Sequence, residues 1–465
     1  MIGLALPLLV AAQAPMASPS PASWTDPTTG HRIVRVDDRP GNYGLYFNYN
    51  PFTPDGKRMV YLTPEGIRVA DTSNWSTRLV LKEKVDRLLF VGHRANVAYY
   101  TTNPTGSSEG EPSFIVWSVD LDSGKRRRIA AMPGGRIESI NADDTLLAGH
   151  RELAPPPPAI AAQGKRDPKT GSPSYSGTDD QGRPLSFAAA KEKWMEARLA
   201  AGVPMEIFAI DIATGQQRRI TASKDWLNHV QFSPTDPDLL MYCHEGPWQQ
   251  VDRIWTIRTD GSAKTKVHQR ILQGEIAGHE YWAPDGRTIW YDLIMPQGMR
   301  WLAGHDVANG ARRWYAIRPG QGSYHFASSP DGRSFSGDGA NDGKYISLFH
   351  PHPDDNPRAR NTLGGDTLIA TGTLETERLV DLASHDYTLE PNQHFTPDGK
   401  WLVYRSNIAG SPRHLRRRNR ETTLDRARTS PAPVEWRGWV GCAMPLIPSC
   451  QRRLASQAGA RNING

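Results

Sequence analysis

The stretch Asn228-His-Val-Gln-Phe-Ser-Pro-Thr-Asp-Pro237 decides the fold, because other segments of the chain repeat its pattern. The copies are Asn-Pro-Phe-Thr-Pro-Asp-Gly-Lys (50–57), His-Glu-Tyr-Trp-Ala-Pro-Asp-Gly-Arg (279–287), His-Phe-Ala-Ser-Ser-Pro-Asp-Gly-Arg (325–333) and Gln-His-Phe-Thr-Pro-Asp-Gly-Lys (393–400). Pro-Asp-Gly favours a tight turn, since proline presets φ and glycine accepts a positive φ. The flanking residues alternate between apolar and polar, which is typical of strands.

A second hairpin signal follows most copies, for example at residues 211–215 and 259–261. Two hairpins in each unit make a four-stranded blade, and units of this length indicate a propeller. We therefore predict an all-β fold, a seven-bladed β-propeller of four-stranded blades over residues 31–412; six or eight blades are the alternatives. The predicted blades lie near 49–83, 88–130, 137–220, 229–270, 279–318, 325–380 and from 393 onward.

Aligning Pro54, Pro234, Pro284, Pro330 and Pro397 reveals a shared register. Five positions before these prolines stand Tyr49, His229, His279, His325 and Asn392. In a closed array of repeats, equivalent positions form a ring around the axis. The sequence thus predicts a histidine-rich patch at one mouth of a central channel. The alternative is that these histidines only link neighbouring inner strands.

Four of the residues near this ring are candidate metal ligands. His279 and His325 offer imidazoles, which suit first-row transition metals and Zn²⁺. Glu390 and Asn392 lie two apart, so on a strand they face the same way. Mixed nitrogen and oxygen ligation favours Mn²⁺, with Ca²⁺, Mg²⁺ and Zn²⁺ as alternatives.

Three further residues are candidate catalytic groups. His229 is left free for proton transfer, since histidine titrates near neutral pH. Arg253 could pair with a substrate carboxylate, or form a salt bridge to Asp252 or Asp236. His244 lies on the strand after the turn, where it supports the site or packs in the core.

We also predict substrate contacts from Tyr49, Gln231, His385 and Arg198. Arg198 belongs to an insert at 151–202. Residues 154–184 of this insert are rich in Pro, Gly and Ser and indicate a loop. Residues 185–201 are good helix formers that end at Gly202. A loop of this length is either a functional lid or disordered.

Both ends of the chain differ from the repeats. Residues 1–30 begin with a short apolar segment that resembles a secretory signal but lacks basic residues. This predicts a periplasmic or secreted protein, with a cytoplasmic one as the alternative. We see no further apolar run long enough to span a membrane.

The C-terminal end is strongly basic. The whole chain has a net charge of +6, whereas residues 413–465 hold eleven Arg and three Asp or Glu, which leaves −2 for residues 1–412. A nucleic-acid-binding arm is one interpretation. We favour out-of-frame translation, because the strand pattern stops abruptly, and we predict no nucleic-acid partner. The sequence does not predict the oligomeric state.

Several of these motifs resemble one enzyme family. His229-Val-Gln-Phe-Ser-Pro, Cys243-His-Glu-Gly-Pro-Trp-x-x-Val-Asp-Arg-Ile-Trp and Gly278-His-Glu-Tyr-Trp-x-Pro-Asp-Gly are similar to the oligogalacturonate lyases, over about residues 31–412. The resemblance implies β-elimination of short uronate oligosaccharides, as in pectin degradation, with Mn²⁺ as cofactor. It makes His279 a metal ligand and His229 or His244 part of the catalytic apparatus. Glu390 and Asn392 replace two histidines of the family's last-blade cluster.

The sequence favours this family over two other classes of protein. There is no Gly-x-Ser-x-Gly segment, so nothing indicates a serine hydrolase of that type. A non-catalytic periplasmic propeller of the Tol type, which binds protein or carbohydrate, uses the same Pro-Asp-Gly repeats. Such a binding module has no need for histidines at one shared register.

Overall fold

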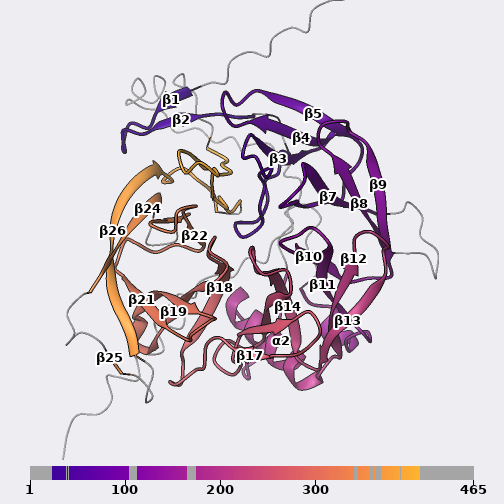
Figure 1. Ribbon diagram of the computed structural model, residues 1–465. Coiled ribbons are helices and arrows are strands. Elements are labelled where there is room, and N and C mark those ends of the chain that lie inside the picture. Colours follow the sequence, from indigo (N-terminus) through magenta and orange to yellow (C-terminus); the bar gives the residue numbers. More distant parts are fainter. Residues whose placement is uncertain are drawn as a thin grey trace, which may run out of the picture.

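The computed structural model describes residues 23–37, 39, 41–103, 113–164, 174–339, 344–354, 361–362, 368–387 and 389–408. Over these residues the chain forms mainly antiparallel sheets arranged in sequence around a central axis, as in a β-propeller (Figure 1). The all-β prediction is confirmed. Of the predicted N-terminal segment 1–30, residues 1–22 lie outside the described residues, as does the basic tail at 413–465.

The first four sheets are consecutive meanders. A three-stranded sheet holds β3 (Arg58–Thr63), β4 (Gly66–Asp71) and β5 (Thr77–Lys82). Three four-stranded sheets follow. The first holds β6 (Arg87–Val91), β7 (Val97–Thr102), β8 (Phe114–Asp120) and β9 (Arg126–Met132), and the second holds β10 (Arg136–Ile140), β11 (Leu146–Glu152), β12 (Met205–Asp211) and β13 (Gln217–Ser223). The third holds β14 (Trp226–Phe232), β15 (Leu239–Glu245), β16 (Ile254–Arg258) and β17 (Thr265–Lys266).

The next two repeats share one nine-stranded sheet. Its first part is β18 (Ile276–Trp282), β19 (Thr288–Ile294), β20 (Arg300–Asp306) and β21 (Arg312–Ile317), and its second is β22 (Phe326–Ser328), β23 (Phe335–Gly337), β24 (Tyr345–Pro353), β25 (Asn361–Thr362) and β26 (Leu368–Asp381). The long strand β26 joins the parts, because it pairs parallel with β21 and antiparallel with β24.

The two ends of the described chain meet. β1 (Ser23–Thr25) pairs with β2 (Arg32–Val34), and the Thr29 hydroxyl donates to the carbonyl of Leu379 in β26 at 2.8 Å. Ile33 packs in one apolar cluster with Leu402 of the last hairpin, β27 (His394–Phe395) and β28 (Leu402–Val403). The N-terminal segment therefore helps to close the ring by side-chain packing.

The inner strands end in equivalent turns. The amide that opens each turn donates to a carbonyl five residues later, as in Thr53 to Arg58, Ala283 to Thr288 and Thr396 to Trp401. Four of the aligned prolines, Pro234, Pro284, Pro330 and Pro397, line a single cavity of about 340 Å³. We call this the proline end of the channel. The shared cavity shows that the repeats face one axis, as their alignment predicts.

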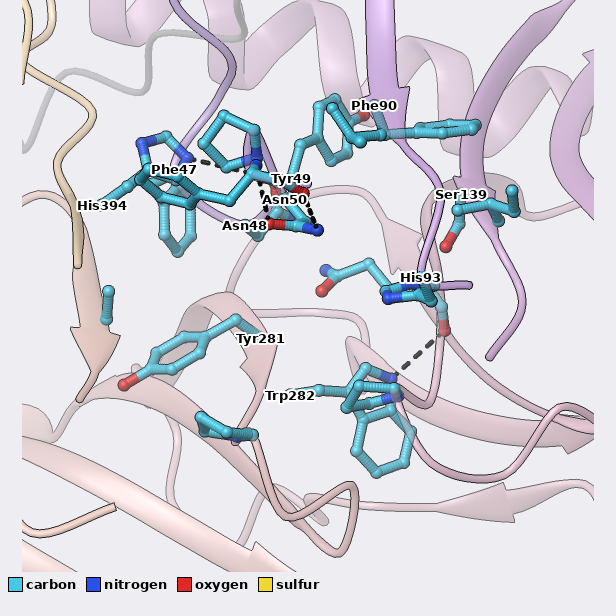
Figure 2. A pocket seen from close by; sticks show the side chains of 18 of the residues that line it. Phe47, Asn48, Tyr49, Asn50, Phe90, His93, Ser139, Tyr281, Trp282 and His394 are labelled. Carbon is cyan, nitrogen blue, oxygen red and sulfur yellow. Dashed lines mark hydrogen bonds between the residues drawn. The ribbon is translucent and has the colours of Figure 1, made fainter. Parts of the chain in front are cut away.

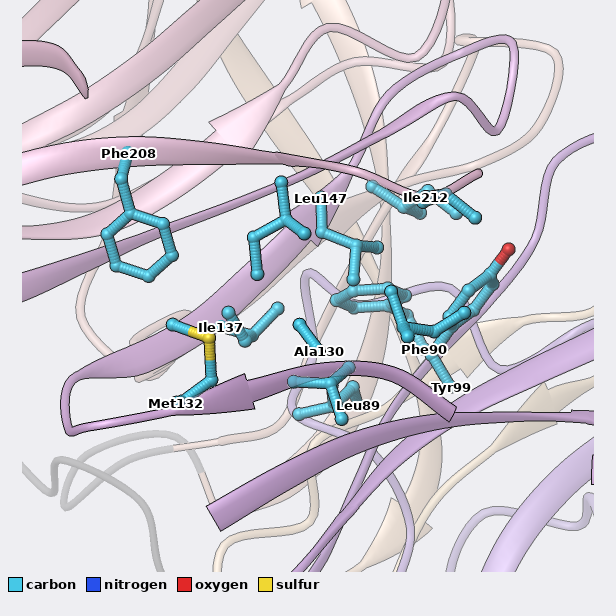
Figure 3. Close-up of a cluster of buried hydrophobic side chains, with 13 residues drawn as sticks. Leu89, Phe90, Tyr99, Ala130, Met132, Ile137, Leu147, Phe208 and Ile212 are labelled. Atoms are coloured by element: carbon cyan, nitrogen blue, oxygen red, sulfur yellow. The ribbon is translucent and has the colours of Figure 1, made fainter. Parts of the chain in front are cut away.

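Buried apolar side chains lie mainly between neighbouring sheets. One cluster joins the sheet of β6–β9 to that of β10–β13 through Leu89, Phe90, Met132, Leu147 and Phe208 (Figure 3). Each fully buried side chain of this size stabilises the fold by about 1.5–3 kcal/mol. Packing between sheets, rather than hydrogen bonding between them, thus holds most of the ring together.

The insert contributes the principal helices. α1 (Pro158–Ala161) is short, and α2 spans Phe187–Ala201. The Ser186 hydroxyl caps the start of α2, and Gly202, with φ 54°, ends it in the left-handed conformation that glycine accepts most readily. A single turn of 3₁₀ helix lies at Pro296–Gly298. Among the helices of the described residues, none is long and apolar enough to cross a membrane.

Candidate functional site

Three residues of the aligned register share an unusual backbone conformation. His229, His279 and Asn392 have φ values of 49°, 50° and 46°. Few residues other than glycine adopt a positive φ. In β14 and β18 this position coincides with a shift in strand register, between Asn228 and Gln231 and between Gly278 and Tyr281. Such bulges re-aim side chains, and strain of this kind is concentrated at functional sites. We call the channel mouth near these residues the histidine end.

The structure brings His279 and His325 together, with ring centroids 5.2 Å apart. Nδ1 of His325 lies 2.6 Å from Asp338, and Nδ1 of His279 lies 3.2 Å from Asp292. Burial raises the pKa of both aspartates, but the paired histidines outweigh it, so both pKa values are lowered. Ionised aspartates fix Nδ1 as the protonated nitrogen and leave Nε2 of each imidazole as the basic one.

The last-blade candidates lie close to His325. Oδ1 of Asn392 accepts the amide of Phe47 at 3.1 Å, and the Phe47 ring stacks on His325 at 4.6 Å. Nδ2 of Asn392 donates to Glu390 Oε2 at 3.3 Å. Tyr46 places its hydroxyl 3.1 Å from Nε2 of His325. Glu390 and Asn392 therefore hydrogen bond to each other and reach His325 through Phe47.

These residues fit a metal in their chemistry. An imidazole that donates Nδ1–H to a buried carboxylate and keeps Nε2 as acceptor is the usual arrangement of a metal-binding histidine. Glu390 and Asn392 add oxygen donors nearby. Within the described residues, however, no three His, Cys, Asp or Glu side chains are gathered closely enough to hold an ion. That His279, His325, Glu390 and Asn392 ligate one metal stays a prediction.

His229 lies in a different charged environment. Its Nε2 is 3.6 Å from Glu245 Oε2, and its side chain is 19% exposed. Burial opposes protonation of His229, but Glu245 and then Glu280 outweigh it and raise the pKa. Since Glu245 favours a proton on Nε2, Nδ1 is the nitrogen that can accept one, and the contacts of the described residues leave Nδ1 without a hydrogen bond.

Arg253 is enclosed by two buried carboxylates. Its Nη1 lies 3.4 Å from Glu245 and its Nε lies 3.1 Å from Glu280. The salt bridge to Asp252 or Asp236 that we considered is wrong. Those two aspartates pair instead with Lys266 at 2.6 Å and with Arg258 at 3.3 Å. Contacts between charged groups run from His229 to Glu245, then to Arg253 and on to Glu280. Glu280 follows His279 in the sequence, so the histidine end is one connected group.

Two predicted residues have partners of their own near the insert. His244 contacts Asp225 at 3.4 Å, and burial lowers its pKa. Arg198 is buried, pairs with Glu152 at 2.5 Å and lies over the Trp226 ring. Arg198 therefore anchors α2 to the sheet, and its contact with substrate stays a prediction.

Of the remaining candidates, Gln231 and Tyr49 line the proline-end cavity, whereas His385 does not. Gln231 is buried and donates to the carbonyl of Glu280 at 2.9 Å. Tyr49 lines the proline-end cavity (Figure 2), and its carbonyl hydrogen bonds with His394 at 3.0 Å. His385 lies 2.7 Å from the carbonyl of Leu389, and burial lowers its pKa. None of these contacts tests a role in substrate binding.

A second cavity opens beside the insert. It has about 580 Å³ and is lined by residues of β10–β12 and β14, among them Arg136, His150, Arg151 and Trp226. The Trp194 ring of α2 packs edge-on against Trp226 at 5.1 Å. The insert thus lies at the histidine end, because Trp226 begins the strand that carries His229.

Sequence reasoning missed the charged partners of the candidate residues. Asp292 lies on β19 and Asp338 directly follows β23, each after an aligned turn, and Arg87 and Arg136 begin inner strands without a Pro-Asp-Gly turn. The turns after β6 and β10 have the same hydrogen bond as the Pro-Asp-Gly turns, from the Gly92 amide to Val97 and from the Asn141 amide to Leu146. This bond aligns β6 and β10 with the other inner strands. No residue motif marks these turns, so the signal is visible only in the structure.

Part of the chain is similar to known proteins of one enzyme family. The family model described as oligogalacturonate lyase matches residues 191–419. Among curated relatives, the oligogalacturonide lyase of Pectobacterium atrosepticum is 28% identical over 218 residues, which cover 44% of this chain and 53% of the relative. The oligogalacturonate lyase of Dickeya dadantii is 28% identical over 225 residues, with the same coverage. The chain spans about half the length of the curated relatives it matches.

Two solved structures share the fold. An oligogalacturonate lyase in complex with manganese has a TM-score of 0.61 and 20% identity, over 84% of this chain and 93% of that one. The oligogalacturonate lyase of Vibrio parahaemolyticus has a TM-score of 0.63 and 18% identity, over 84% and 94%. The residues that the family model matches include His229, Arg253, His279 and His325, and this part of the chain is similar to the oligogalacturonate lyases.

Proposed function

We propose that this protein cleaves short uronate oligosaccharides by metal-assisted β-elimination, the reaction of a carbon–oxygen lyase. The proposal rests on one observation, that three imidazoles of the histidine end lie in two different surroundings. His279 and His325 are neighbours whose Nδ1 atoms face buried aspartates. His229 lies in the adjacent sheet, with Nε2 towards Glu245 and Nδ1 available to accept a proton.

His229 is the proposed general base. Its Nδ1 takes the proton from C5 of the uronate, and Glu245 stabilises the imidazolium that forms. The electron pair of the broken C5–H bond forms the C4–C5 double bond, and the C4–O bond breaks. The sugar attached at C4 leaves with the electron pair of the C4–O bond and takes up a proton. The product is an unsaturated uronate.

The C5 proton is weakly acidic, so the neighbouring carboxylate must be neutralised in the transition state. A bound Mn²⁺ would supply Lewis-acid chemistry there. His279 and His325 would hold it, with oxygen atoms from Glu390 and Asn392. The ligand chemistry of these residues supports this assignment, as does the manganese complex of a protein with the same fold. Ca²⁺, Mg²⁺ and Zn²⁺ are the alternatives for the same site.

We extend the proposal to architecture and location. Seven blades fit the series of sheets if β27 and β28 begin the last blade and the N-terminal segment packs against it. A periplasmic or secreted location is consistent with the signal-like N-terminus and with an extracellular acidic polysaccharide as the source of substrate.

An ultraviolet assay for unsaturated products tests the function directly. The purified protein is incubated with saturated oligogalacturonates of defined length, with and without added Mn²⁺, and absorbance of the C4–C5 double bond is followed. We expect product from the shorter chains, and less of it after chelation. Absence of unsaturated product from every uronate oligosaccharide, with Mn²⁺ present, would overturn the proposal.

A further inference from the structure

Arg253 has the wrong surroundings to receive a substrate carboxylate. Its side chain is 5% exposed and lies between Glu245 and Glu280, which are as deeply buried. The group thus holds one guanidinium and two carboxylates. A third carboxylate would meet net negative charge in a region of low dielectric, which is unfavourable. The cation that binds the uronate must be sought elsewhere at the histidine end.

The surroundings of Arg87 differ from those of Arg253. It opens β6 and is half-buried, and the ion pairs within the described residues leave it without a carboxylate partner. Its electrostatic neighbours are Arg136, Glu138, Tyr43 and Tyr49. Burial, and then the charge of Arg136, lower the pKa of Arg87 to about 10, so it stays charged at neutral pH. A half-buried cation that no carboxylate pairs with directly is stabilised when a ligand supplies the counter-charge.

Arg136 occupies the equivalent position in the next sheet. Arg87 and Arg136 each lie five residues before the amide that opens the turn, that of Gly92 and of Asn141. The Arg136 side chain is 31% exposed, and its Nε lies 3.3 Å from Glu138. Two arginines therefore lie at one register on neighbouring inner strands, close enough for the charge of Arg136 to act on Arg87.

Glu138 is a shared partner. Besides Arg136, it accepts the amide of Val230 at 2.8 Å and lies 3.7 Å from His150. Burial lowers the pKa of His150, more than Glu138 raises it. Arg87, Arg136, Glu138 and His150 together form one wall of the histidine end. Because His150 is neutral, the two arginines and the one carboxylate of Glu138 give this wall a net positive charge. The Val230 amide also places the wall directly beside His229.

The cavity next to Arg136 gives room for a sugar. Its volume of about 580 Å³ lies in the range of small-ligand pockets, about 300–1,000 Å³. Trp226 and Leu153 give it apolar surface, and Arg136, His150 and Arg151 give it hydrogen-bond donors. An aromatic ring with nearby donors suits a sugar ring that carries hydroxyl groups and a carboxylate.

We propose that Arg87 and Arg136 together bind a carboxylate of the uronate chain, and that the cavity beside Arg136 holds the adjoining sugar. This inference rests on the proposed function and deepens it. It gives the protein a reason to prefer acidic oligosaccharides that is independent of any metal. It also makes Arg253 a positioning residue, which holds Glu245 against His229.

The test is a binding measurement by calorimetry. The probe is a saturated oligogalacturonate of two or three sugars, and its methyl-esterified form, which carries no charge on C6, is the ligand control. Binding is measured in the His229→Ala background, where turnover is removed. Arg87→Gln and Arg136→Gln are compared with Arg333→Gln, which loses the same charge from an exposed residue at the proline end. Arg87→Lys checks that the charge itself matters.

We expect Arg87→Gln and Arg136→Gln each to raise the Kd of the acidic probe about 10-fold, since a charge-assisted hydrogen bond is typically this strong. Arg87→Lys should recover part of the affinity, and Arg333→Gln should match the parent. The Kd of the esterified probe should be the same in all variants. An Arg87→Gln variant with the same thermal unfolding temperature as the parent has no folding defect. The Kd of Arg136→Gln for the acidic probe tests the same inference a second time.

Several results would overturn the inference. One is an acidic-probe Kd that stays within a factor of two in both glutamine variants; another is equal weakening of the esterified probe. The outcome is separate from that of the proposed function. If the wild type forms unsaturated product but the Kd is unchanged, only this inference fails. If Arg87→Gln weakens binding of the acidic probe but the wild type forms no product, only the elimination reaction fails. If no uronate binds at all, both fail.

Discussion

The two ends of the channel are formed by the same inner strands, yet they differ in what their residues do. At the proline end, the turns are alike, and a carboxylate such as Asp55 or Asp398 is used locally, within its own turn. At the histidine end, the aligned position holds histidine in three copies but tyrosine or asparagine in the others, and the charged groups pair across strands and sheets. Repetition thus builds the ring, and departure from repetition builds the site.

The largest expected effect is the loss of the proposed base at the histidine end. His229→Ala removes the group that accepts the C5 proton, so we expect kcat to fall by about 10²–10⁴-fold. Metal content should be unchanged. Initial rates of product formation and elemental analysis give the two readings, and His352→Ala, an exposed histidine, is the matched control. Loss of metal with turnover restored by added Mn²⁺ would make His229 a ligand instead.

Removing the central cation of the same end should mainly affect stability. Arg253→Met leaves Glu245 and Glu280 buried without a counter-charge, and breaking a buried pair in this way typically costs about 3–5 kcal/mol. Denaturant unfolding measures the change. Arg126→Met, which breaks a more exposed pair with Glu83, should cost about 1 kcal/mol or less. An Arg253 variant as stable as the wild type would mean that these carboxylates are not held by charge.

The metal prediction separates His279 from His229. His279→Ala should weaken Mn²⁺ binding by about tenfold or more, since even the loss of a residue that orients a ligand costs about 10–100-fold. Titration of the metal-free protein with Mn²⁺ measures the affinity. Activity should fall in proportion to metal content. If affinity is unchanged, the paired imidazoles of His279 and His325 have another role.

The pH profile tests the contact between Glu245 and His229. Glu245 raises the pKa of His229, and the base must be neutral to act, so activity is lost as pH falls through that raised pKa. Glu245→Gln removes the carboxylate and lets burial lower the pKa. The acidic limb of kcat should therefore move to lower pH. A shift to higher pH, or none, would show that Glu245 does not control the titration of His229.

The smallest effect is expected at the proline end. Asp55→Ala removes the acceptor for the Thr53 hydroxyl and the Lys57 amide, which should cost about 1 kcal/mol of folding free energy. Turnover should be unchanged, because these contacts are local. A large loss of kcat without unfolding would remove the distinction between the two ends.

The sequence predicts what depends on local pattern. The Pro-Asp-Gly copies predicted the turns and the ring, and α2 lies within the predicted helical stretch 185–201. The shared register led to His279 and His325, whose rings are in contact. Whether there are seven blades, and which residues bind substrate, stays a prediction.

Contacts between residues far apart in the chain could not be predicted. The pairing of Arg253 with Glu280 spans two sheets, and nothing near either residue favours it over Asp252, the direct neighbour. The positive φ of His229 and Asn392 was likewise hidden, because neither position holds a glycine. The arginines of β6 and β10 escaped alignment, since their turns lack the proline that marks the others.

The long strand β26 has a consequence for how the ring moves. Because it pairs with both β21 and β24, the repeat that carries His279 and the repeat that carries His325 belong to one hydrogen-bonded sheet. A fluctuation that frees one of them must break backbone bonds shared with the other, so the two imidazoles are carried as a single rigid body. His229 belongs to a separate sheet and is joined to that body by side chains alone. Relative motion of the sheets would therefore change the distance from His229 to the proposed metal site before it changed the distance between His279 and His325.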